Sequence, residues 1–175
     1  MIIEQPPFLK QMQHEAKTSL LVETLTNVHR TKTFAFNVAP TRNSPFWIRS
    51  WSYTDEGKAH NCWENFPLEL SGVQFEPNMK LVPSISKFVK ETGPYKVAGL
   101  SLLPPGCRIE PHQDNQHTNI VCHIPLLTNK SSKLVVDGEQ KSLEIPGKMI
   151  CFDDSVEHSS FNNGTTDRVT LYLQK

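Results

Sequence analysis

Apolar and polar residues alternate along most of the second half of this chain. Side chains on a strand point in turn to its two faces, so a period of two predicts a strand with one buried face. Runs of this kind fall at residues 97–103, 119–126, 133–136, 140–145, 149–152, 158–161 and 168–173. Turn-forming residues separate them, and Asp137-Gly138 predicts a hairpin between two of them.

The first half of the chain has a different pattern. Apolar residues recur at helical spacing over 9–28, which favours a helix, although the β-branched residues of 18–26 leave a strand open as the alternative. Residues 33–38 and 46–53 are rich in aromatic side chains with period-two character and predict strands. A second helix is predicted over 78–92, where Gly93-Pro94 ends it.

Many short strands separated by turns are typical of a sandwich or barrel, here with helices at the N-terminal end. Thirteen prolines disfavour long helices. The 175 residues contain no repeat or linker-like stretch, so we expect one domain over 1–175. Within it, residues 1–95 form a helix-and-strand extension and residues 96–175 form the core that carries the chemistry.

Composition narrows the classes of partner. Basic and acidic residues balance at 18 each, and no run of like charge stands out, so we expect neither nucleic acid nor a membrane as partner. The first ten residues lack the basic and apolar regions of a signal peptide, which favours a cytoplasmic protein. Four scattered cysteines, Cys62, Cys107, Cys122 and Cys151, form no CxxC pair, and we expect them to be reduced thiols.

The candidate chemistry lies around residues 105–119. His112 and Asp114 are two residues apart beside a predicted turn, so on a strand both point to one face, and His158 follows 46 residues later. Two histidines and one carboxylate form the facial triad of non-haem Fe(II) oxygenases. Three protein ligands leave room for a chelating 2-oxo acid and O₂. A lone His-x-Asp is more often a capping or solvated pair, so the prediction depends on the whole set.

Arg168 completes that set. It opens the last predicted strand, where alternate residues are apolar, and a guanidinium in such a place needs a partner. The far carboxylate of 2-oxoglutarate would supply a bidentate pair, while an acid within 153–157 is the structural alternative. Thr170 lies on the same face of the strand, and His123 is a polar residue within the apolar strand 119–126. We expect both to contact the cosubstrate.

Residues 97–173 resemble the aspartyl/asparaginyl β-hydroxylase family of 2-oxoglutarate/Fe(II) oxygenases. Four motifs carry the resemblance in order: SLLPPGCRIEPHQDN, NIVCHIPLL, PGKMICFDDSVEHSSFN and DRVTLYL. The resemblance implies a double-stranded β-helix, the cupin-like jelly roll, that is mainly β with peripheral helices. It also implies iron ligands at His112 and His158 and cosubstrate contacts at Arg168 and His123. The implied reaction is hydroxylation of a C–H bond, with succinate and CO₂ as coproducts.

Two positions depart from the family pattern. Some members have glycine where Asp114 stands, and the retained carboxylate is similar to that of free-proline hydroxylases. An arginine often present two residues before the His123 position, which helps to bind 2-oxoglutarate, is here Val121. Arg168 would then carry more of the cosubstrate binding.

The substrate is expected to be a free amino acid or a short peptide. Trp47, Arg49 and Trp51 share one face of a predicted strand. Arg49 is therefore a candidate for a substrate carboxylate, with Trp47, Trp51, Trp63 and His117 lining the pocket. Core packing is the alternative for the tryptophans, and a structural salt bridge is the alternative for Arg49.

Three other functions compete with a hydroxylase. Halogenation and desaturation use the same cofactors, but Asp114 argues against a halogenase. A non-enzymatic, metal-binding cupin-like module has no use for Arg168. In the third alternative, a structural or interaction domain, the histidines would be incidental.

Overall fold

A computed structural model describes residues 6–26, 47–49, 62–114 and 119–175. Predicted strand 33–38 and most of predicted strand 46–53 lie outside these ranges. Helices and strands follow in this order: α1 (Pro7–Thr26), β1 (Ile48–Arg49), β2 (Glu64–Leu70), β3 (Val73–Gln74), α2 (Glu76–Leu81), α3 (Pro83–Thr92), β4 (Val97–Leu103), β5 (Arg108–His112), β6 (Ile120–Leu127), β7 (Ser132–Val136), β8 (Glu139–Ser142), β9 (Ile150–Asp153), β10 (His158–Asn162) and β11 (Arg168–Gln174).

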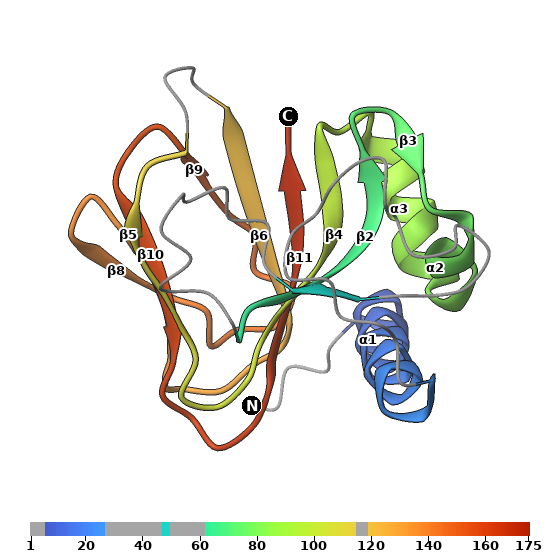
Figure 1. Ribbon diagram of the computed structural model, residues 1–175, viewed down its shortest axis with the longest axis horizontal. Helices are drawn as coiled ribbons and strands as arrows, with labels where there is room; N and C mark the ends of the chain where they lie inside the picture. Colours follow the sequence, from blue (N-terminus) through green and yellow to red (C-terminus); the bar gives the residue numbers. More distant parts are fainter. Residues whose placement is uncertain (1–5, 27–46, 50–61, 115–118) are drawn as a thin grey trace.

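The strands form two antiparallel sheets. The larger sheet has the order β1-β2-β4-β11-β6-β9, with β3 paired to β2, and the smaller has the order β5-β10-β7-β8. Figure 1 shows three layers, with the small sheet on the left, the large sheet in the middle and the helices on the right. The predicted jelly roll with peripheral helices is thereby confirmed.

The hydrophobic core lies between the large sheet and the helices. β4 and β11 pair along their whole length, and alternate residues such as Leu100 and Leu171 are fully buried in this core. Leu9, Met12 and Ala16 of α1 cover them from the other side. Glu15, on the same helix, accepts hydrogen bonds from the backbone N–H groups of residues 84 and 85 at 2.9 and 3.0 Å. It therefore caps α3 and joins the two helices.

The predicted helix over 78–92 is two helices in the structure. α2 ends at Leu81 and α3 begins at Pro83, with Val82 between them. Proline has no backbone N–H and its ring clashes with the preceding turn, so a helix restarts there rather than continuing. No helix in the described ranges is long and apolar enough to cross a membrane.

Sequence patterning missed two strands that matter for the site. β2, which contains Pro67, pairs with β4 with a register shift between Pro67 and Glu69. Its seven residues are all buried, although apolar residues stand only at every second position of ENFPLEL. β5 contains Pro111 and pairs with β10. Proline is a common signal against a strand, which explains why neither segment was predicted.

The prediction of four reduced thiols is wrong. Cys62 is bonded to Cys107, and Cys122 to Cys151. The first disulfide joins the chain before β2 to the turn between β4 and β5, while the second links neighbouring strands β6 and β9 at paired positions. Scattered cysteines hide such pairs, because sequence alone does not say which strands are neighbours. A cytoplasmic location, which was inferred from the first ten residues, stays a prediction.

Candidate metal centre

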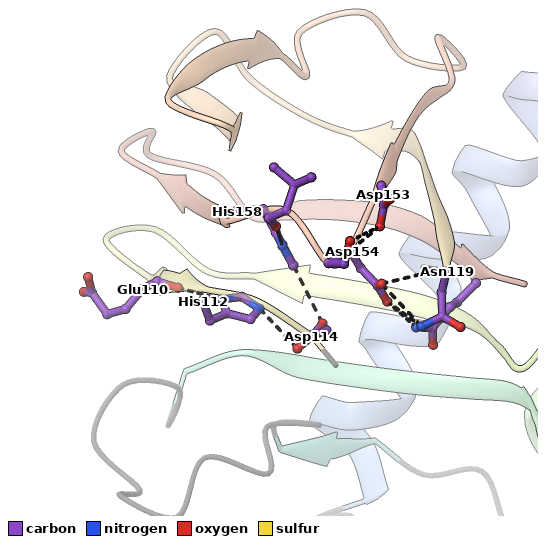
Figure 2. A network of polar contacts seen from close by, with 10 residues as sticks. Glu110, His112, Asp114, Asn119, Asp153, Asp154 and His158 are labelled. Atoms are coloured by element: carbon purple, nitrogen blue, oxygen red, sulfur yellow. Dashed lines mark hydrogen bonds and ion pairs between the residues drawn. The ribbon is translucent and has the colours of Figure 1, made fainter. Parts of the chain in front are cut away.

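Two neighbouring strands bring the predicted ligands together. β5 and β10 are antiparallel, and His158, the first residue of β10, lies opposite His112, the last residue of β5. Asp114 follows two residues later, beyond the end of the strand. Residues that are 46 positions apart in sequence thus meet at one end of the small sheet, as the sequence predicted (Figure 2).

The three side chains converge on one point. Each imidazole Nε2 lies 3.7 Å from a carboxylate oxygen of Asp114, His112 from Oδ1 and His158 from Oδ2. The two ring centroids are 4.3 Å apart, and the three ligand atoms lie within 4.8 Å of one another. Two imidazoles and a carboxylate are a donor set that suits a first-row divalent metal and leaves coordination positions open. These residues therefore fit a catalytic metal ion.

Both histidines are already oriented for metal binding. Their Nδ1 atoms lie 2.7 Å from the carbonyl oxygen of Glu110 for His112, and 2.9 Å from that of Val156 for His158. A carbonyl only accepts, so each Nδ1 carries a proton, and each Nε2 faces Asp114 and can bind a metal ion once it is deprotonated. Burial lowers the pKa of His158, but the nearby Asp114 carboxylate and the hydrogen bond to the Val156 carbonyl outweigh it and raise the pKa overall.

A pocket of about 400 Å³, its mouth included, extends from the metal ligands into the space between the sheets. Arg168 lies at its inner wall with no exposed surface, and burial lowers its pKa to about 10, which still leaves it charged at neutral pH. Its Nη1 donates to the hydroxyl of Ser160. Its Nε and Nη2 are buried and, among the described residues, have no hydrogen-bond partner. The alternative partners within 153–157 do not pair with it.

Other polar groups on the same wall are also unsatisfied. Thr170, two residues after Arg168, is fully buried, and its hydroxyl has no partner among the described residues. His123 lies on β6, opposite Tyr172 of β11, and its Nδ1 is likewise buried without a partner in that part of the chain. Burial, with the positive charges of Arg168 and His158, lowers the pKa of His123 to about 3, so this imidazole is neutral. The wall thus offers several unused hydrogen-bonding groups to a polar ligand.

The structure does not place the predicted substrate residues together in the pocket. Trp47 is fully buried in the core, where its ring packs 5.1 Å from that of Phe66 and its Nε1 donates to the carbonyl of Ser19. It is a core residue and does not line the pocket. Arg49 lies opposite Glu64 in the register of β1 and β2, and its side chain is not described. Trp51 and His117 lie outside the described residues.

Trp63, which was predicted to line the pocket, does so. Its indole donates to the hydroxyl of Ser101 at 2.8 Å, and Ser101 and Ser160 are pocket residues that were not predicted. Ser160 accepts from Arg168 while its own hydroxyl donates to the carbonyl of Lys133 at 2.9 Å. Serine is too common for its type to mark a site. The alternation of HSSFN, which puts Ser160 on the same face as His158, was the available signal.

Comparisons with known proteins agree on one family. A model of the family described as Aspartyl/Asparaginyl beta-hydroxylase matches residues 37–175. Aspartate beta-hydroxylase domain-containing protein 2 of Rattus norvegicus is 37% identical over 70 residues, which are 40% of this chain and 20% of that protein. Ornithine lipid ester-linked acyl 2-hydroxylase of Rhizobium tropici is 27% identical over 114 residues, which are 63% of this chain and 40% of that protein. The chain thus spans less than half the length of either relative.

Among solved structures, a predicted oxalate decarboxylase from Thermotoga maritima aligns with a TM-score of 0.44 and 17% identity. The alignment covers 64% of this chain and 78% of that one.

Proposed function

Because this chain belongs to the aspartyl/asparaginyl beta-hydroxylase family, we propose that it is a hydroxylase that depends on Fe(II) and 2-oxoglutarate. The observation that carries the proposal is Arg168, a buried cation that lines the same pocket as the His/Asp/His cluster and has two nitrogens without a partner in the described part of the chain. A buried charge without a counterion is costly, and a dicarboxylate that reaches from the metal to Arg168 would supply the counterion.

His112, Asp114 and His158 would hold the metal. Bound Fe(II), with 2-oxoglutarate as the reductant, supplies the O₂-dependent oxidation of a substrate C–H bond. The protein does the rest by position. The carbonyls of Glu110 and Val156 keep both imidazoles turned with Nε2 toward Asp114.

Arg168 would bind the far carboxylate of the cosubstrate. Ser160 fixes one nitrogen of the guanidinium, which leaves Nε and Nη2 for a bidentate contact with a carboxylate. Thr170 would add a hydroxyl donor. His123, being neutral, can donate from one ring nitrogen to a carboxylate oxygen without bringing a second charge into the pocket.

The substrate class is a free amino acid, a peptidyl residue or a related small molecule. The two relatives are named for hydroxylation of aspartate and of an ester-linked acyl chain of a lipid, so a first screen includes all of these classes. Arg49 and His117 stay candidates for substrate contacts. The rival function is a metal-binding module without catalysis, which would leave the unpaired cation at Arg168 without a purpose.

The test compares two 2-oxo acids under anaerobic conditions. Purified protein receives Fe(II) and then either 2-oxoglutarate or pyruvate, which lacks the far carboxylate, and the visible charge-transfer band reports chelation. A charged hydrogen bond contributes about 1.5–3 kcal/mol, so we expect wild type to prefer 2-oxoglutarate by about 10- to 150-fold. In Arg168→Met, a variant of similar length, the two acids should bind alike.

Each other outcome has a definite meaning. Iron binding without a band with either acid favours the non-catalytic module. A band of equal strength with both acids in wild type removes Arg168 from the cosubstrate site. Succinate release on adding O₂ and candidate substrates then separates a hydroxylase from an enzyme that only consumes the cosubstrate.

A further inference from the structure

A second carboxylate, Asp154, is fully buried close to the metal centre and is not one of its ligands. It directly follows β9, the edge strand of the large sheet. Figure 2 shows it between Asp114 on one side and Asn119 on the other. These two residues flank 115–118, the segment that joins β5 to β6.

Asp154 bonds to both flanks of this segment. The backbone N–H of Asp114 donates to the Asp154 carbonyl at 2.9 Å, and the Asp154 N–H donates to the Asn119 carbonyl at 3.1 Å. The Asp154 carboxylate accepts from the backbone N–H of Asn119 at 3.3 Å and from its side-chain amide at 3.2 and 3.3 Å. A single residue therefore fixes the chain on both sides.

The carboxylate also bonds to the last strand. Gln174, at the end of β11, donates to Oδ2 at 2.7 Å. Within the described residues all donors to this carboxylate are amides, and both of its oxygens accept. Asparagine would present an NH₂ group to one of these donors unless the Gln174 amide turned over, so the observed arrangement favours a carboxylate at this position. A buried carboxylate without a cation is costly and needs a reason.

The position of Asp114 supplies the reason. β5 ends at His112, so the sheet register fixes His112 and His158 but does not extend to Asp114. We propose that Asp154 is a positioning residue for Asp114. The bonds of its carboxylate to Asn119 and Gln174 hold its own backbone in place. Its carbonyl then holds the backbone N–H of Asp114, so that the Asp114 carboxylate stays 3.7 Å from each imidazole Nε2. This inference rests on the proposed metal site and names a residue outside the ligand set that holds one ligand in place.

The test is a double-mutant cycle on Co(II) affinity. Binding of Co(II) to the metal-free protein is measured by the visible absorption of the bound ion. Loss of an outer-shell contact typically weakens metal binding by about 10- to 100-fold, and we expect that range for Asp154→Asn. In the Asp114→Ala background the same change should cost about threefold or less, because the residue that it positions is gone. Asp153→Asn is the matched control: among the described residues the Asp153 carboxylate accepts only from Ser155, so this change should leave affinity nearly unchanged.

Gln174→Met provides a second variant that keeps the Asp154 charge and lies on another strand. It should weaken Co(II) binding a few-fold in wild type and not at all in Asp114→Ala, and it carries the test if Asp154→Asn does not fold. Equal losses in the two backgrounds would overturn the inference while leaving the metal site intact. Failure of the wild-type protein to bind Co(II) would remove the metal site and this inference with it.

Discussion

The two faces of the large sheet are built from alternate residues of the same strands, yet they differ in kind. On β11, every second residue from Val169 packs into the apolar core under the helices. The residues between them, Arg168, Thr170 and Tyr172, face the small sheet, and Arg168 and Tyr172 line the pocket. Successive residues of β11 thus belong to two different surfaces. One is apolar and packed, and the other is polar, with buried groups that have no hydrogen-bond partner among the described residues.

The difference shows where stability and binding reside. The helix face gains free energy by removing apolar side chains from water. The pocket face spends some of it, because the unpartnered nitrogens of Arg168 and the hydroxyl of Thr170 are buried without compensation among the described residues. A ligand that satisfies them recovers that cost as binding energy. Substitutions on the two faces should therefore separate stability from binding.

The largest expected effect is on the helix face. Phe66→Ala removes a fully buried ring that packs against Trp47, so the free energy of unfolding should fall by about 3–5 kcal/mol. Urea denaturation measures the loss. Co(II) affinity of the folded protein, measured below the denaturation range, should stay nearly the same. A parallel collapse of metal affinity would mean that the two faces are not separable.

His158→Ala should have the opposite effect: a large loss of Co(II) affinity with little loss of stability. Removing a ligand should weaken Co(II) binding by more than the roughly 100-fold typical of an outer contact. The side chain has one hydrogen bond to a carbonyl, so the ligand-free protein should lose only about 1 kcal/mol of stability. Isothermal titration with Co(II), beside a denaturation curve, checks both values. Unchanged affinity would remove His158 from the centre.

Arg168→Met tests whether the pocket face contributes to stability. Replacing a buried charge by an apolar side chain of similar size is often neutral or stabilising, so the free energy of unfolding without ligand should be unchanged or rise by up to about 3 kcal/mol. The thermal midpoint of ligand-free protein measures this. A fall of several kcal/mol would show that Arg168 is a structural residue whose partner belongs to the fold.

The smallest effect is expected at Ser160. Its hydroxyl fixes one nitrogen of Arg168, and the loss of one such hydrogen bond costs about 1 kcal/mol, or roughly fivefold in 2-oxoglutarate affinity for Ser160→Ala. Metal affinity should not change, because Ser160 does not contact the ligands. A change in Co(II) binding with constant 2-oxoglutarate affinity would contradict this assignment.

The sequence predicted the parts of this architecture that depend on local periodicity. Strands β4, β6, β10 and β11 lie within two residues of their predicted bounds, because alternation is strong where one face meets the core. The His112, Asp114 and His158 cluster was also predicted, from the His-x-Asp spacing and a second histidine at the start of a predicted strand, although Asp114 lies beyond the end of β5.

Other features depend on long-range pairing, which no local pattern encodes. The partner of Cys122 follows from β6 and β9 being neighbours. The burial of Trp47 follows from where α1 lies against the sheet. Asp154 was noted only as a possible partner of Arg168, because its contacts come from three segments that are distant in sequence.

The pairing of His158 with His112 has a consequence for how this chain can vary in length. The metal centre depends on the register of β5 against β10, and a slip of one residue would turn His158 to the opposite face. The 45 residues between the two histidines contain strands β6 to β9, and a tight hairpin at Asp137-Gly138 joins β7 to β8. Insertions at that exposed turn should leave the register intact, so the hairpin is a natural position for grafting a peptide tag or a small domain.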